Sequence, residues 1–141
     1  MVIDGGYTGK IKTVGTELLN LLLNEGYVPV ISPVALSEEF DFLNVDGDRA
    51  AAYIAGILGA DKVIFLTNVN GLYLNDNLVQ KISVEEAKEI LPKIGFGMEK
   101  KVLACTEALT LGANEAIISS GMVSNPISSA IAHSNCTVIS K

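Results

Sequence analysis

The chain has 141 residues, of which 49% are hydrophobic and 18% are charged, and its formal net charge is -6. This length allows one hydrophobic core and is short for two domains, and the apolar content excludes a disordered tail. The acidic balance disfavours a general nucleic-acid or membrane-surface binder, which needs a basic face, and no apolar run is long enough to span a bilayer.

The first segment pairs a glycine-rich turn with a leucine-rich helix. Three glycines within residues 5–9 follow the end of a short strand at residues 2–4 and predict a tight turn, or a backbone that a ligand approaches closely. Lys10 lies at the edge of this turn, where it is able to meet an anion, although a plain glycine-rich hairpin explains the same residues. Leucines on one face then predict a helix over residues 13–25, which ends at Gly26.

A nearly continuous apolar run follows at residues 28–35. Such a run is typical of a strand covered on both faces. Pro29 and Pro33 lack the N–H group that a central strand needs, so we expect them near its ends or at an irregular pairing. Residues 37–42 then form an acidic loop or hairpin.

The most informative stretch is residues 43–51, where polar and flexible residues directly precede an apolar helix. The Asn44 amide can donate and accept hydrogen bonds. Asp46 suits the start of a helix, where a carboxylate accepts from free N–H groups and is favoured by the helix dipole. Asp48 follows in the first turn, where it is able to orient cations. A well-capped helix without further function, closed by Gly59, is the alternative.

Two further polar loops adjoin predicted elements. The strand at residues 62–69 ends in a polar loop at residues 67–73, the position where open α/β sheets bind ligands. Gly95 and Gly97 lead into a helix that carries Lys101 in its first turns. Lysine opposes the dipole there, so a nearby anion would account for it, whereas a solvated lysine is the alternative.

The remaining residues continue an alternation of strands and helices. They comprise a turn at residues 75–77, a strand at 79–82, a capping box from Ser83, a helix distorted or ended by Pro92, a helix ended by Gly112, a strand at 116–119, a helix start at Asn125 and Pro126, and a strand at 136–139. The alternation predicts an α/β fold, a three-layer αβα sandwich with a mostly parallel sheet.

Cysteine and histidine are too few for several common kinds of site. Cys105 and Cys136 both lie in apolar surroundings, so we expect buried reduced thiols in a cytoplasmic protein rather than a disulfide or metal pair. His133 is the only histidine, which disfavours a histidine-based triad and a zinc site. We assign no residue as a metal ligand.

The chain lacks both the P-loop and the G-x-G-x-x-G fingerprint, so the common nucleotide folds are disfavoured. Phosphoryl transfer requires cations on the phosphates, a carboxylate that positions those cations, and alignment of the reactants. Lys101, Asp48 and Asn44 are able to fill parts of that scheme. The residues alone carry the interpretation no further.

At these motifs the chain resembles the C-terminal, nucleotide-binding half of the amino acid kinase family, in its acetylglutamate kinase branch. The motifs in the family's order and spacing are PVISP at 29–33, LNVDGD at 43–48, LTNVNG at 66–71 and GMEKK at 97–101. Residues 6–11, 119–121 and 125–129 are most similar to the kinases of archaeal and thermophile lysine biosynthesis. Those kinases phosphorylate the side-chain carboxylate of 2-aminoadipate or glutamate held on an acidic amino-group carrier protein.

The resemblance implies a role for each matching position. Asn44 would hold the amino-acid substrate, Asp48 would orient the catalytic lysines, and Lys101 would neutralise phosphate charge in the transition state. ATP, with Mg2+, would be surrounded by Thr67, Asn68, Val69, Gly71, Leu72, Tyr73, Gly95, Gly97, Met98 and Lys101. From charge complementarity, we expect Lys10 to contact the substrate or its acidic carrier.

The chain departs from the family in two ways. Asn68 stands where the family usually has Asp. The family's N-terminal half, which supplies a second phosphate-binding lysine, a Gly-Gly turn and much of the acceptor pocket, is absent. We therefore expect residues 1–141 to form a single lobe that binds nucleotide but transfers phosphate poorly or not at all. Met1 would then be an internal start, a fragment boundary or the start of one subunit of a split enzyme.

Three functions stay open. The first is an ATP-dependent kinase that forms an acyl phosphate on acetylglutamate, or on carrier-bound aminoadipate or glutamate, in lysine or arginine biosynthesis. The second is a non-catalytic nucleotide-binding or regulatory module, or one subunit of a split kinase. Relatives that act on nucleoside monophosphates or carbamate are the third. A face left by the missing half is able to drive association into a homo-oligomer.

Overall fold

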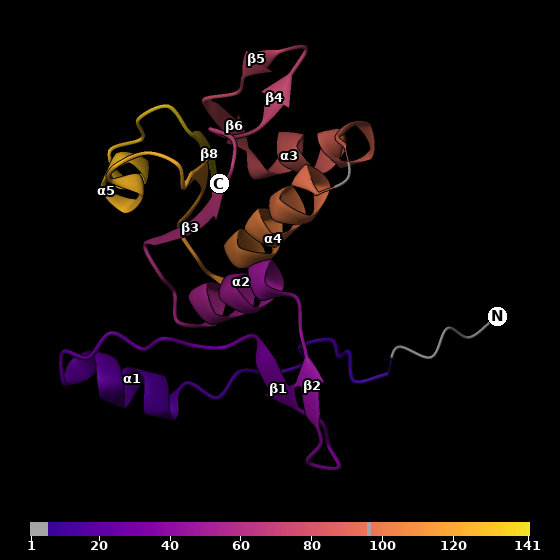
Figure 1. Ribbon diagram of the computed structural model, residues 1–141, viewed down its shortest axis with the longest axis vertical. Helices are drawn as coiled ribbons and strands as arrows, with labels where there is room; N and C mark the ends of the chain where they lie inside the picture. The colour runs from indigo at the N-terminus through magenta and orange to yellow at the C-terminus, as the bar shows by residue number, and fades with distance from the viewer. Residues whose placement is uncertain (1–5, 96) are drawn as a thin grey trace.

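The computed structural model describes residues 6–95 and 97–141, and its main sheet has the strand order β3-β7-β8-β6 (Figure 1). The strands are β3 (Lys62–Thr67), β6 (Lys81–Ser83), β7 (Glu115–Ser120) and β8 (Thr137–Ser140). β3 runs parallel to β7, and β6 runs parallel to β8, whereas β7 and β8 are antiparallel. The prediction of a mostly parallel sheet is confirmed.

Helices cover both faces of this sheet (Figure 1). On one face lie α2 (Gly47–Ile57), α3 (Val84–Ile90) and α4 (Met98–Leu111), which share a core with the inward side chains of β3 and β7. On the other face, α5 (Pro126–Ile131) packs through Ala130 against Ile117 and Val138. Cys105 and Cys136 are free and buried, as the sequence predicted. The three-layer arrangement follows because apolar side chains alternate between two covered faces.

Local signals set most helix ends. The capping box forms as predicted, with the Ser83 hydroxyl accepting from the Glu86 amide and the Glu86 carboxylate accepting from the Ser83 amide. α3 then ends in a 3-10 turn, Leu91–Lys93, which contains the predicted proline. Pro126 occupies the first turn of α5 as expected, but the Asn125 side chain makes no capping hydrogen bond.

Residues 6–44 form a separate layer below α2 (Figure 1). This layer contains α1 (Glu17–Asn24) and an antiparallel hairpin of β1 (Val34–Leu36) and β2 (Phe42–Asn44). α1 starts four residues later than predicted, and Thr16 at its N-cap makes no side-chain hydrogen bond. It ends before Gly26, as predicted, where φ is +80°.

The predicted doubly covered strand at residues 28–35 is wrong. Only Val34–Leu36 is a strand, and the side chains of Val28 and Val30 are 87% and 98% exposed. Pro29 and Pro33 remove two backbone donors, and no strand in the described residues pairs with residues 28–32. The predicted strand at residues 2–4 lies outside the described residues.

A second small hairpin joins β4 (Tyr73–Leu74) to β5 (Asn77–Leu78). Its turn is the one predicted from the sequence, and both Asn75 and Asp76 adopt a positive φ. Asparagine and aspartate tolerate that conformation better than other non-glycine residues. Across residues 6–95 and 97–141, every helix is too short or too polar to cross a membrane.

Candidate functional site

The candidate site lies where two parallel strands end and two helices begin. Thr67 ends β3, and its carbonyl accepts a hydrogen bond of 2.7 Å from the Gly121 amide, just beyond β7. Because a helix that follows or precedes a parallel strand runs back along it, the first residues of α2 and α4 come to this same edge. In open α/β sheets this is the edge at which ligands bind.

A cavity of about 390 Å³ opens at this edge. It is lined by Thr67, Asn68, Val69, Gly97, Met98 and Lys101, all of which belong to the nucleotide-binding set expected from the sequence. Asn68, which stands where the family usually has Asp, is part of this lining. Its side-chain oxygen accepts from the Thr67 hydroxyl at 3.3 Å. The loop after β3 and the start of α4 therefore form one hollow.

The other expected nucleotide contacts lie outside this hollow. Leu72 is fully buried in the core. Gly71 is packed against β8, and an added Cβ there would lie 2.4 Å from the Thr137 hydroxyl oxygen. Tyr73 begins the β4–β5 hairpin, and Gly95 precedes α4, where its carbonyl accepts from the Glu99 amide. The cavity is thus lined by the expected residues directly after β3 and at the start of α4, but not by Gly71, Leu72, Tyr73 or Gly95.

Asp48 and Lys101 form an ion pair between α2 and α4. Asp46 caps α2 by accepting from the Arg49 amide at 3.1 Å, which fixes Asp48 in the first turn. The Lys101 ammonium donates to both Asp48 carboxylate oxygens, at 2.9 and 3.1 Å. Both side chains are more than two-thirds buried, so the pair offsets part of the cost of removing each charge from water. The structure brings the two expected catalytic residues together.

Cys105 lies one helical turn beyond Lys101 and is fully buried. Burial raises the pKa of its thiol strongly, and the nearby Asp48 carboxylate raises it further. A thiol with a raised pKa stays protonated at neutral pH and is a poor nucleophile. Cys105 therefore acts as a core residue at this site.

Asn44 and the segment before Lys10 lie side by side. The backbone N–H of Asn44 donates to the Tyr7 carbonyl at 2.7 Å, and the backbone N–H of Gly9 donates to the Asn44 backbone carbonyl at 2.9 Å. An added Cβ at Gly9 would lie 2.8 Å from Leu43 Cδ1 and 3.2 Å from Leu43 Cβ, so glycine favours this close approach. Lys10 is exposed and lines an open cavity beside β1. The two expected substrate contacts thus share one edge of the hairpin.

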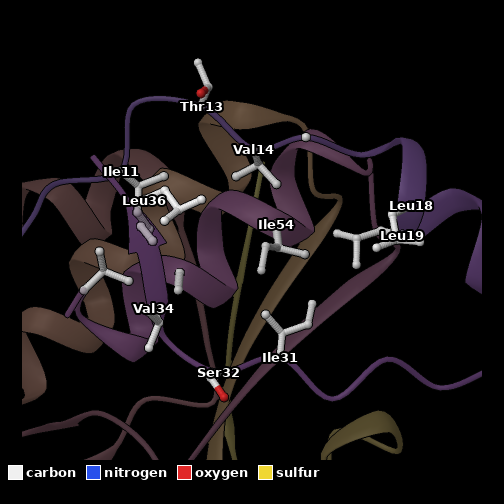
Figure 2. A pocket seen from close by; sticks show the side chains of 14 residues that line it. Ile11, Thr13, Val14, Leu18, Leu19, Ile31, Ser32, Val34, Leu36 and Ile54 are labelled. Atoms are coloured by element: carbon white, nitrogen blue, oxygen red, sulfur yellow. The ribbon is translucent and has the colours of Figure 1, made fainter. Parts of the chain in front are cut away.

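Another cavity, of about 370 Å³, lies between the α1 segment, β1 and α2. Figure 2 shows that aliphatic side chains from these elements, Leu18, Val34 and Ile54 among them, surround it. Its lining contains no charged side chain, with Thr13 and Ser32 as its hydroxyl groups. Because phosphates need cationic or N–H donors, this cavity does not fit a nucleotide.

Two interactions near the site were not anticipated from the sequence. The Arg49 guanidinium forms a two-bond ion pair with the Glu107 carboxylate, of which the Nε–Oε2 bond is 3.0 Å. This contact raises the pKa of Arg49. Thr137, in β8, accepts from the Leu72 amide at 2.8 Å and donates to the Val79 carbonyl at 2.6 Å. The sequence does show an arginine beside Asp48 and a threonine in a predicted strand, but it does not indicate which residues they contact.

Comparison with known proteins gives a consistent result. The model of the amino acid kinase family matches residues 2–120. A Nitrosopumilus maritimus protein, provisionally named LysW-aminoadipate/LysW-glutamate kinase, is 63% identical over 97% of the chain and 51% of its own length. The LysW-aminoadipate/LysW-glutamate kinase of Sulfolobus acidocaldarius is 47% identical over 92% of the chain and 50% of its own length. The chain spans about half the length of these curated relatives.

Solved structures give the same fold. N-acetylglutamate synthase from Neisseria gonorrhoeae, complexed with coenzyme A and L-arginine, superposes with a TM-score of 0.89 at 26% identity. The match covers 99% of the present chain and 34% of the synthase. Carbamate kinase from Giardia lamblia bound to AMP-PNP has a TM-score of 0.62 over 74% of the chain, at 22% identity.

Proposed function

The chain belongs to the amino acid kinase family, and from this premise we propose that it forms the nucleotide-binding lobe of an ATP-dependent kinase. The acceptor we propose is the side-chain carboxylate of an N-modified amino acid, which becomes an acyl phosphate. The observation that carries the proposal is the placement of the Asp48–Lys101 pair beside the cavity at the carboxyl end of β3. The names of the relatives favour carrier-linked aminoadipate or glutamate, in lysine biosynthesis, over acetylglutamate in arginine biosynthesis.

The cavity has the chemistry that phosphates require. Gly97 precedes α4 and lines the hollow without a side chain, so a phosphate is able to approach the backbone at the start of this helix. Lys101 adds a full positive charge to the same hollow. Thr67 and Asn68 add a hydroxyl and a side-chain amide to the lining. Lys101 would neutralise the charge that spreads over the transferred phosphoryl group.

Mg2+ fits this site as a companion of the nucleotide. It prefers oxygen ligands and is commonly held by one or two carboxylates together with substrate phosphates and water. The described residues contain no group of three His, Cys, Asp or Glu side chains able to hold a metal ion, and both Asp48 oxygens accept from Lys101. We infer that the metal enters with the phosphates, where it neutralises part of their charge.

The acceptor would lie on the side of Asn44 and Lys10. The Asn44 amide is able to hydrogen-bond the amino-acid part, and Lys10 is able to attract an acidic carrier protein. Because the curated relatives are about twice as long as the chain, we propose that transfer needs the remaining half of such a kinase. The buried free thiols favour a reducing, cytoplasmic location.

Calorimetric titration with MgADP tests the nucleotide site. We expect the wild-type chain to bind and Lys101→Ala to bind at least about tenfold more weakly, as the loss of a charge-assisted contact predicts. Lys88→Ala, which removes an exposed lysine from the end of α3, is the control and should bind like the wild type. A folded wild-type chain that binds no nucleotide contradicts the proposal.

Adding the complementary half of a relative then separates the two remaining functions. A kinase lobe should regain acyl-phosphate formation, which hydroxylamine traps as a hydroxamate. A chain that binds MgADP but never supports transfer would be a regulatory or non-catalytic nucleotide-binding module.

A further inference from the structure

We propose that Arg49 and Glu107 are positioning residues, whose ion pair holds α2 against α4 so that Lys101 is aimed into the nucleotide cavity. The inference rests on the proposed function, because it assumes that Lys101 meets a phosphate. It adds a pair of residues that neither lines the cavity nor belongs to the motifs of the family resemblance.

The closest steric contact between the two helices lies in their C-terminal halves. α2 packs on α4, and at Gly56 the backbones approach so closely that an added Cβ would lie 2.4 Å from Leu111 Cβ and 2.9 Å from the Ala108 carbonyl oxygen. Ala52, one turn earlier in α2, is fully buried and has only a methyl group. Small side chains allow close approach but interlock little, so the beginning of α2 needs another constraint.

Two ion pairs supply that constraint, from consecutive residues of α2. Asp48 reaches Lys101 near the start of α4, and Arg49 reaches Glu107 in the second half of α4, so together they tie the beginning of α2 to two levels of α4. The two pairs differ in geometry. The planar guanidinium makes two parallel hydrogen bonds to a carboxylate and so fixes orientation as well as distance, whereas a lysine ammonium acts as a point charge on a flexible stem.

The difference in geometry fits a division of roles. Lys101 must turn at least part of its charge from Asp48 toward a bound phosphate, so the Asp48–Lys101 pair weakens at the moment of use. Arg49 and Glu107 have no such task, since neither lines the cavity. Their pair can therefore keep the helices in register while the Asp48–Lys101 pair rearranges.

The test compares ADP with adenosine, because only ADP carries the phosphates that Lys101 would contact. We expect Arg49→Met and Glu107→Gln each to weaken MgADP binding about tenfold, the size of coupling within one ion-pair network, and to leave adenosine binding unchanged. The double variant should be no worse than either single one, since both remove the same pair. Arg49→Lys keeps the charge but loses the fork, and should bind ADP between wild type and Arg49→Met.

Lys62→Met is the matched control. Lys62 pairs with Glu115 where β3 and β7 begin, at the other edge of the sheet from the cavity. The side chains of this pair are 34% and 19% exposed, close to the 37% and 21% of Arg49 and Glu107. The control should bind both ligands like the wild type. An equal loss of ADP and adenosine affinity, an unchanged ADP affinity in Arg49→Met, or the same loss in Lys62→Met overturns the inference. If wild type binds ADP, such a result leaves the proposed function intact, whereas a wild type that binds no ADP overturns both.

Discussion

The Lys101 ammonium contacts both oxygens of Asp48 and also lines the cavity, so a single side chain belongs both to the ion pair between α2 and α4 and to the cavity wall. The sequence predicted that both residues lie early in two helices, and the family resemblance implied that Asp48 orients the lysine. It did not predict how the pair is supported. Arg49 is the residue next to Asp48, but its partner Glu107 is 58 residues away, and only the packing of α2 on α4 brings them together.

Lys10 allows a prediction at the same scale. Its side chain is exposed at the hairpin edge beside Asn44, far along the chain from the loops that line the cavity at the end of β3. Lys10→Glu should weaken binding of an acidic amino-group carrier protein by at least about tenfold, through like-charge repulsion, and leave MgADP affinity unchanged. Surface plasmon resonance for the carrier and calorimetry for MgADP measure the two effects.

Lys88→Glu, with the same change of net charge in α3, is the control for Lys10→Glu and should leave carrier binding near the wild-type value. Equal losses of carrier and nucleotide binding in Lys10→Glu would count against a carrier contact at this position.

At the scale of elements, the sequence predicted what local chemistry determines. The capping box at Ser83, the helix ends before Gly26 and Gly59, and the turn at Asn75 all depend on residues within one or two turns. The predicted strand at residues 28–35 was wrong because an apolar segment is buried only where another element covers it. Val30 is almost fully exposed; Pro29 and Pro33 argued against a central strand, but nothing in the local sequence shows whether another element covers the run.

The capping box gives a prediction on pH. Hydrogen bonds from the Ser83 amide and hydroxyl hold the pKa of Glu86 below its ordinary value in the folded chain. A lowered folded pKa adds stability that is present above the unfolded pKa and is lost as pH falls through the folded pKa. Glu86→Gln should therefore show a shallower acid-induced fall in the free energy of unfolding than wild type, measured by urea denaturation across the acid range. If the free energy of unfolding fell equally steeply with pH in both proteins, the Glu86 carboxylate would not contribute to the pH dependence of stability.

Thr137 links two elements and gives a second prediction at this scale. Its hydroxyl bonds the Leu72 amide and the Val79 carbonyl, the two residues that flank the β4–β5 hairpin. Thr137→Val keeps the shape but leaves these buried groups without a partner, at a cost of about 2 kcal/mol. Thr137→Ser keeps the hydroxyl and loses one methyl, at a cost of about 1 kcal/mol. Urea denaturation should rank wild type, Ser and Val in that order, and a Val variant as stable as Ser would rule out the proposed hydroxyl bridge.

For the whole molecule, the layer of residues 6–44 differs from the rest. α1 has no buried residue, although Leu18, Leu21 and Leu23 are among its side chains. By contrast, the β7 strand is buried from Ala116 to Ser120. Burial of apolar area is the main source of stability, so the two parts should open with different free energies. An apolar face of this kind is also a surface on which association is expected.

Hydrogen exchange followed by mass spectrometry measures that difference directly. Amides of Glu17–Asn24 should exchange at least about a hundredfold faster than those of Glu115–Ser120, because α1 can open locally while the sheet requires global unfolding. Repeating the measurement over a range of protein concentrations separates the two sources of protection. Protection of α1 that rises with concentration would mean that copies of the chain cover its leucines, whereas strong protection at all concentrations would contradict the exposed arrangement of this layer.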